Sequence, residues 1–361
     1  MTTHHEQPRD HLRLGRPGSL IAALPAVLGF VPEKSLVLVA LEDGQMGAVM
    51  RADLSADLAD NVGELAQMAG NAGAERVIAV IVDADGALCP LCLEEHRRLF
   101  EALTEALGDR GVEMYAGHVV DRVEAGGRWH CVDGCGSGGT VDDPDSSPLA
   151  AAAVLGGRRL YRRRAELQAV VQPADPEHGA RLAALIEAES ARREGEWAQD
   201  PDGRGRRDVE AAIGAARRVC DGAELDDAEL STLACALGDV VVRDTLYALA
   251  VGSDAGPAEA LWAVLSRALP DPWRVEPLVL LAFSAYARGD GPLAGVSLEA
   301  ALRSDPAHRM AGMLDTALRS GMRPEQIRDL AVTGYRVGRR LGVHLPPRRS
   351  YGRRLGAQWC D

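Results

Sequence analysis

The first half of the chain alternates short apolar runs with amphipathic stretches. Four runs predict strands, at residues 36–41 (LVLVAL), 46–54, 76–82 (RVIAVIV) and 112–123. The first and third are nearly continuous aliphatic runs, typical of strands that are covered on both faces. Two stretches have apolar residues at helical spacing, at 58–68 and 91–107. Strands separated by helices predict an α/β domain, with a mixed sheet and flanking helices.

The second half of the chain carries one helical pattern after another. The predicted helices are 178–194, 207–222, 226–237, 239–251, 257–269, 277–287, 292–304 and 307–320. Residues 286–311 resemble a tetratricopeptide-type hairpin, although one hairpin is not an array. Residues 195–206 are polar, and we expect them to be mobile. The pattern therefore predicts an all-α, helical, repeat-like domain.

Three breaks in these patterns predict the domain organisation. Residues 126–148 are rich in Gly, Asp and Ser and also hold cysteines, so we predict a loop there. Prolines at 173 and 176 mark the end of the α/β domain. We therefore predict an α/β domain at 1–173, a helical domain at 176–345 and a basic flexible tail at 346–361.

Charge narrows the classes of partner. The net charge of -13 disfavours general nucleic-acid binding and adsorption to anionic membranes. Residues 335–354, with seven arginines and no acidic residue, leave the basic tail as the one segment suited to nucleic acid. No apolar segment is long enough to span a bilayer, so we predict a cytoplasmic protein with reduced cysteines. Lys34 is the only lysine, and no Walker glycines precede it.

Several blocks resemble one known family. They are LRLGRPGSLIAALPAVLGFVPEKSLVLVAL near the start, GRW before the cysteine loop at 127–135, LGDVVVRDTLYALA at 237–250 and PLVLLAFSAYARGDGPLAGVSLEAALRSDP at 277–306. These blocks resemble the actinobacterial DUF4192 family, and they occur in the same order as in that family. DUF4192 is a domain of unknown function. The loop after Trp129 has fewer cysteines and more glycines than the family pattern. The resemblance assigns no residue a role.

Two acidic residues follow a predicted buried strand. Asp83 and Asp85 come directly after residues 76–82, and ligands gather beyond the carboxyl ends of strands in open α/β sheets. We predict that they line a ligand site together with Ser35, which opens the first strand. The alternative is a strand-ending turn, which Asp and Gly also favour.

The cysteines form two close pairs in sequence. Cys89 and Cys92 make a C-x-x-C at the start of a predicted helix, and Cys131 and Cys135 lie in the glycine-rich loop. Four thiolates would hold a tetrahedral zinc ion if the pairs meet. The first pair alone would suit thioredoxin-like redox chemistry. Plain reduced cysteines without cofactor are the third interpretation, and the one favoured by the irregular second spacing.

Asp239, Arg243 and Asp244 lie on one predicted helix. Asp239 and Arg243 are four residues apart and would pair along its surface. If the helix is buried, the three would form a polar network that joins helices or meets the α/β domain.

No recognisable catalytic motif emerges from the sequence. The leading hypothesis is therefore a non-catalytic cytoplasmic interaction or regulatory protein, whose protein partner binds the helical domain and which needs no cofactor. One alternative is an enzyme or small-ligand sensor, with a pocket at the strand carboxyl ends or between the domains. Another is a zinc-stabilised module. The sequence leaves the oligomeric state open.

Overall fold

The computed structural model describes residues 16–42, 45–55, 57–155, 158–173, 175–196 and 201–348. Contacts divide the chain into two compact units. The first runs to Leu167 and includes Arg319–Met322; the second comprises Gln168–Leu318 and the residues from Arg323 onward. Across the described ranges, no helix combines the length and the apolar character needed to cross a membrane.

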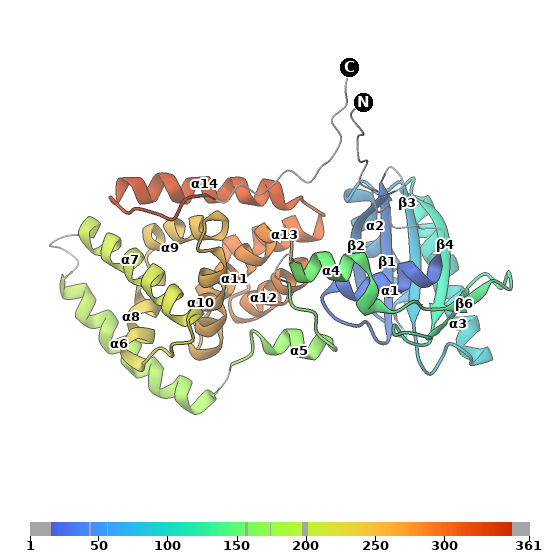
Figure 1. Ribbon diagram of the computed structural model, residues 1–361, viewed down its shortest axis with the longest axis horizontal. Coiled ribbons are helices and arrows are strands. Elements are labelled where there is room, and N and C mark those ends of the chain that lie inside the picture. The colour runs from blue at the N-terminus through green and yellow to red at the C-terminus, as the bar shows by residue number, and fades with distance from the viewer. Residues whose placement is uncertain are drawn as a thin grey trace, which may run out of the picture. The chain divides into compact units, whose positions relative to one another are not determined.

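The first unit is built on a mixed six-stranded sheet (Figure 1). Its strands are β1 (Ser35–Glu42), β2 (Gln45–Asp53), β3 (Arg76–Val82), β4 (Glu113–Val120), β5 (Arg128–Cys131) and β6 (Gly138–Thr140), in the order β2-β1-β3-β4-β5-β6. Only β3 and β4 are parallel neighbours, and the other neighbouring pairs are antiparallel. The four strands predicted from apolar runs, and the mixed sheet, are confirmed.

Helices cover both faces of this sheet. The helices of this unit are α1 (Pro17–Leu28), η1 (Ala59–Asn61), α2 (Val62–Asn71), α3 (Pro90–Gly108), η2 (Pro144–Ser146) and α4 (Pro148–Leu155), and α5 (Arg164–Ala169) lies at the unit boundary. Apolar residues of α2 and α3, such as Leu65 and Leu103, pack on a core that includes Leu38. Val37 and Val39 point to the opposite face and are fully buried too. Figure 1 shows α1 lying across the sheet on the side turned to the viewer.

The prediction of a loop at residues 126–148 is wrong in part, because this segment contains β5, β6 and η2. β5 pairs with the buried end of β4, with Cys131 opposite His118. Neither short strand has the apolar alternation by which strands are recognised in a sequence. Their extended conformation comes from pairing with neighbours.

The second unit is a run of helices, as predicted. They are α6 (Pro176–Glu196), α7 (Pro201–Cys220), α8 (Asp227–Leu237), α9 (Val240–Leu246), η3 (Tyr247–Val251), α10 (Ala255–Ala268), α11 (Val275–Arg288), α12 (Gly291–Ser304), α13 (Arg309–Arg319) and α14 (Pro324–Arg340). α11 is buried on all sides from Pro277 to Ala287. It forms the centre of this helical core.

Two segments of this unit differ from the prediction. Residues 195–206 were expected to be mobile, but α6 continues to Glu196 and α7 begins at Pro201, so 195–196 and 201–206 are helical, while 197–200 lie outside the described residues. Their charges have partners there; for example, Arg204 Nη1 donates to the carbonyl oxygen of Arg193 at 2.8 Å. The helix α14 has no counterpart among the predicted elements. Most of the predicted tail, residues 349–361, lies outside the described residues.

Candidate functional site

A charged cluster lies at the carboxyl end of β3. β1 runs antiparallel to β3, with Ser35 opposite Val82. This register brings Lys34, which precedes β1, beside the residues that follow β3. Lys34 Nζ lies 3.1 Å from Asp83 Oδ1 and 3.0 Å from Asp85 Oδ2. Both predicted acidic residues therefore share the single lysine of the chain.

Asp83 is the buried centre of this cluster. Asp83 is 5% exposed and His96 of α3 is 4% exposed. The Nε2 atom of His96 lies 3.2 Å from Asp83 Oδ2. Burial by itself raises the pKa of Asp83, but the Lys34 ammonium and the backbone N–H of Gly86 outweigh it and leave the pKa below its usual value. The carboxylate is therefore ionised at neutral pH. His96 Nδ1 is buried and makes no hydrogen bond to the described residues.

The backbone of Lys34 has an unusual conformation. Its φ of 43° makes it the one non-glycine residue in the left-handed region within the described ranges. The Leu54 N–H donates to the Lys34 carbonyl oxygen at 2.8 Å, and the two ion pairs hold the side chain. Strained conformations persist where surrounding contacts fix them, and they gather at functional sites.

The C-x-x-C pair lies at the start of α3, just after the turn that follows Asp83, and its Cys92 is the member close to the cluster. Cys89 is the N-cap residue of α3, and Pro90 opens the first turn. The backbone N–H of Cys92, the Cys92 side chain and the Leu91 N–H lower the pKa of the Cys89 thiol, although no N–H makes a regular capping hydrogen bond to it. The pKa of Cys92 is raised, chiefly by Cys89, with a smaller contribution from the Asp83 charge. The two thiols are therefore inequivalent.

Gly86 shows how closely Cys92 and Asp83 approach. A Cβ atom added at Gly86 would lie 2.1 Å from Asp83 Oδ2 and 3.1 Å from the Cβ of Cys92. Only glycine fits between the carboxylate and the cysteine. The turn from β3 into α3 thus holds Cys92 close to the buried carboxylate.

Ser35 does not join the acidic pair. Its side chain is buried, donates to the Glu33 carbonyl oxygen at 2.6 Å and accepts from Arg51 Nε at 2.9 Å. The structure brings Lys34 and His96 to Asp83 instead. Neither was a candidate from the sequence; the only signal for Lys34 was its being the sole lysine, and His96 resembled any helical histidine.

A hollow of about 690 Å³ lies at the other end of the strands. It is lined by Gln67, Gly70, Asn71, Asp109 and Arg110, which belong to the ends of α2 and α3 that lead into β3 and β4.

A comparison with known protein families gives a match that spans both units of the chain. A family model described as "Domain of unknown function (DUF4192)" matches residues 17–325. The chain belongs to the DUF4192 family. No curated protein and no solved structure matches it. The charged cluster and both cysteine pairs lie within the DUF4192 match.

The second cysteine pair of this DUF4192 chain forms a cluster of its own. One ligand atom each of Cys131, Asp133 and Cys135 lies within 4.8 Å of the others. Among the described residues, Cys89 and Cys92 do not belong to that group. The sulfur atoms of the predicted four-cysteine set are thus not gathered around one point.

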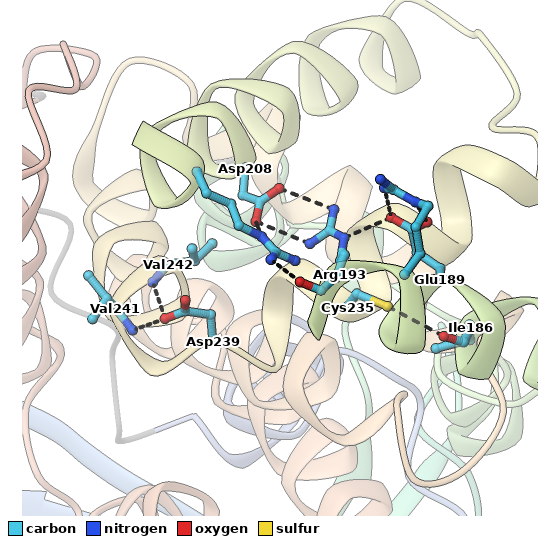
Figure 2. Close-up of polar contacts among 10 residues, drawn as sticks. Ile186, Glu189, Arg193, Asp208, Cys235, Asp239, Val241 and Val242 are labelled. Carbon is cyan, nitrogen blue, oxygen red and sulfur yellow. Dashed lines mark hydrogen bonds and ion pairs between the residues drawn. The ribbon is translucent and has the colours of Figure 1, made fainter. Parts of the chain in front are cut away.

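Asp239, Arg243 and Asp244 have contacts within the helical unit of the DUF4192 fold. Asp239 caps α9, accepting from the Val241 N–H at 2.8 Å, as Figure 2 shows. Arg243 Nη1 lies 2.5 Å from Glu276 Oε1, and its Nε lies 3.6 Å from Asp244. The surface pair expected between Asp239 and Arg243 is replaced by the cap and by Glu276.

A buried ion pair lies next to this cap (Figure 2). Arg193 of α6 makes two hydrogen bonds to Asp208 of α7, at 3.1 and 3.2 Å, and a third to Glu189 at 2.8 Å. Cys235 of α8 lies close by and donates to the Ile186 carbonyl oxygen at 3.6 Å. The bonds between Arg193 and Asp208 join α6 to α7, so we interpret this ion pair as structural.

Proposed function

We propose that Cys89 and Cys92 form a thiol–disulfide exchange centre, so that this protein is an oxidoreductase acting on disulfides. The observation that carries the proposal is the placement of two half-buried thiols at the first turn of α3, with Cys92 close to the buried Asp83 that pairs with His96. Cys89 is the attacking thiol, because the helix terminus favours its thiolate. Cys92 is the resolving thiol.

The reaction balances as a two-electron exchange. The Cys89 thiolate attacks one sulfur of a substrate disulfide, and the other substrate sulfur leaves and takes up a proton. The Cys92 sulfur then attacks Cys89 Sγ, and its proton passes to the second departing substrate sulfur. The substrate is reduced to a dithiol, and the protein is oxidised to the Cys89–Cys92 disulfide. A dithiol donor reverses that oxidation.

Asp83 and its partners act as positioning residues. The Asp83 charge helps to keep Cys92 protonated, which reserves Cys92 for the second step. His96 and Lys34 hold the carboxylate in place.

The surroundings of the pair suit a polypeptide substrate. Leu88 is 73% exposed and Leu91 is 80% exposed, so large apolar side chains stand on either side of Cys89. Exposed apolar side chains that adjoin a reactive group indicate a protein-binding surface. The alanine variants of both leucines should reduce a disulfide-bonded polypeptide more slowly, yet reduce a small aromatic disulfide at the wild-type rate.

The test is reduction of insulin by the full-length protein, with dithiothreitol as donor. We expect catalysis that is abolished in Cys89→Ser, and a trapped mixed disulfide in Cys92→Ser. Cys220→Ser, which removes an exposed cysteine of α7, is the matched control and should keep full activity. Undiminished activity in Cys89→Ser, or no catalysis by the folded wild type, would refute the proposal.

A second candidate function is the interaction role, with a protein partner bound by the helical unit. Met313 on α13 and Leu330 on α14 support it, since they are 59% and 51% exposed. A captured partner that is lost in Met313→Asp and Leu330→Asp, but kept in Leu185→Asp on α6, would favour this role. Under either function we propose a cytoplasmic location and an actinobacterial source.

A further inference from the structure

The β5–β6 turn folds back on itself around two cysteines. The Cys131 N–H donates to the Ser137 carbonyl oxygen at 2.9 Å, which closes the turn. Gly134 and Gly136 have φ of 72° and 82°, a conformation that other residues rarely adopt. These two glycines turn the chain on both sides of Cys135 and bring it back toward Cys131.

Asp133 is oriented within this turn. Its Oδ1 accepts the Cys135 N–H at 3.0 Å, which leaves Oδ2 available to a ligand. Oxygen and sulfur atoms of Asp133, Cys131 and Cys135 lie within 4.8 Å of one another. Three atoms bound to one metal ion at 2.0–2.3 Å would be spaced about 3.3–3.8 Å apart, so only a small contraction separates this turn from a coordination geometry.

A histidine on the neighbouring strand lies next to Cys131, although its nitrogen atoms are not among the three ligand atoms within 4.8 Å of one another. His118 of β4 lies opposite Cys131 in the β4–β5 register, and its Nδ1 is 3.9 Å from Cys131 Sγ. The residue is only 5% exposed. Its ring packs edge-on against Trp129, with ring centroids 5.2 Å apart, which fixes the direction of the imidazole.

We propose that Cys131, Cys135, Asp133 and His118 form a mononuclear zinc site. Two thiolates, one imidazole and one carboxylate are four ligands that suit tetrahedral Zn²⁺, a borderline-soft ion. Metal binding would draw the His118 ring toward the three ligand atoms that already lie together. The ion would add a cross-link between the short hairpin of β5 and β6 and the strand β4, beyond their backbone pairing and the His118–Trp129 contact. This site is independent of the Cys89–Cys92 pair and of the redox function proposed for it.

The neighbouring His130 provides a sharp control. Successive residues of a strand point to opposite faces, so His130 of β5 points away from the side chains of Trp129 and Cys131. His130 is adjacent in sequence to a ligand yet lies outside the proposed coordination sphere.

The test is a titration of the reduced, metal-free full-length protein with Co²⁺ alone and then with Zn²⁺. We expect one equivalent of Co²⁺ to give thiolate-to-cobalt absorption and tetrahedral d–d bands, which Zn²⁺ then displaces. Cys131→Ser and Cys135→Ser should abolish the bands. Asp133→Asn alters an exposed residue and should weaken binding by roughly tenfold or more without affecting the fold.

Further variants test which residues bind the metal ion. His130→Gln and the double variant Cys89→Ser/Cys92→Ser should each keep one equivalent of cobalt, whereas His118→Gln should weaken binding. Folded wild type without cobalt bands, bands that persist in Cys131→Ser, or bands lost with Cys89 and Cys92 would each overturn the proposal.

Discussion

Lys34 illustrates how a single residue is fixed by contacts from distant parts of the chain. Its backbone lies in a region that favours glycine, and its ammonium group holds Asp83 and Asp85. The hydrogen bonds to Asp85 and Asp83 raise the pKa of Lys34, so the charge persists at high pH. The unfavourable backbone conformation and the favourable ion pairs oppose each other at the same residue.

A pair of substitutions separates these two effects. Lys34→Gly and Lys34→Ala both remove the ion pairs, but only glycine also relieves the left-handed conformation. We expect Lys34→Gly to be more stable than Lys34→Ala by about 1 kcal/mol in denaturant unfolding. Equal stabilities would show that the residue is not strained at this position.

Glu189 gives the helical unit a defined response to acid. The hydrogen bonds and charges of Arg192, and then of Arg193, lower the pKa of Glu189 to about 2, against its burial. Because the folded-state pKa lies below the ordinary value of 4.5, the stabilisation is fully present above about pH 5. It is lost as the pH falls from there toward 2.

We therefore expect Glu189→Gln to reduce the free energy of unfolding at pH 7 by about 1 kcal/mol, since Arg192 is exposed and solvent screens its charge. The gap between the variant and the wild type should close as the pH falls from about 5 to 2. Urea unfolding across this pH range measures it. Glu187→Gln, on the exposed side of the same helix, is the control; a pH-independent gap for Glu189→Gln would contradict the expectation.

At the scale of elements, α14 approaches α9 and η3 through a glycine. A Cβ atom added at Gly334 would lie 2.8–2.9 Å from backbone atoms of Asp244, Thr245 and Ala248. Backbone atoms cannot move aside as a flexible side chain does. Gly312 of α13 is a matched case with open space, because nothing lies within 4 Å of its added Cβ.

The same substitution should have opposite effects at these two helical glycines. We expect Gly334→Ala to destabilise the protein by roughly 1–3 kcal/mol through overpacking. Gly312→Ala should stabilise it by up to about 1 kcal/mol through helix propensity. Thermal or denaturant unfolding of the two variants provides the comparison, and a stabilised Gly334→Ala would mean that α14 is not packed closely at this point.

At the scale of the whole molecule, the chain has two separate cores. The first is the sheet with its helices, and the second surrounds the buried helix α11. The Arg193–Asp208 pair belongs to the second unit alone. Damage to this pair should therefore remain in the helical unit.

Arg193→Ala removes two hydrogen bonds to the buried Asp208 carboxylate and leaves it the weaker contact with Arg204 Nε at 3.8 Å, which we expect to cost about 3 kcal/mol. Hydrogen exchange measured by mass spectrometry should show faster exchange in peptides of α6 and α7, with β1 and β3 unchanged. An equal loss of protection in β3 would indicate that the two units unfold as one.

The apolar pattern of the sequence was sufficient to predict those helices and strands whose buried positions are filled by aliphatic residues. Residues 36–41 and 76–82 are strands with both faces covered, so nearly every position is aliphatic. The helices of the second unit were predicted because their buried apolar residues recur at helical spacing. β5 and β6 were not predicted, because pairing with β4 decides them and their own sequences carry little signal. α14 was missed although Pro324 opens it and its buried residues, Ile327, Ala331, Gly334 and Gly338, follow helical spacing.

For the candidate site, the sequence by itself determined which groups are available: the acidic pair after a buried strand, the C-x-x-C before a helix and a single lysine. Tertiary structure alone decided which of them meet. The antiparallel register of β1 and β3 set Lys34 against Asp83, and the packing of α3 on the sheet buried His96 beside the same carboxylate. Contacts between residues far apart in a chain depend on register and packing, which local residue patterns do not encode.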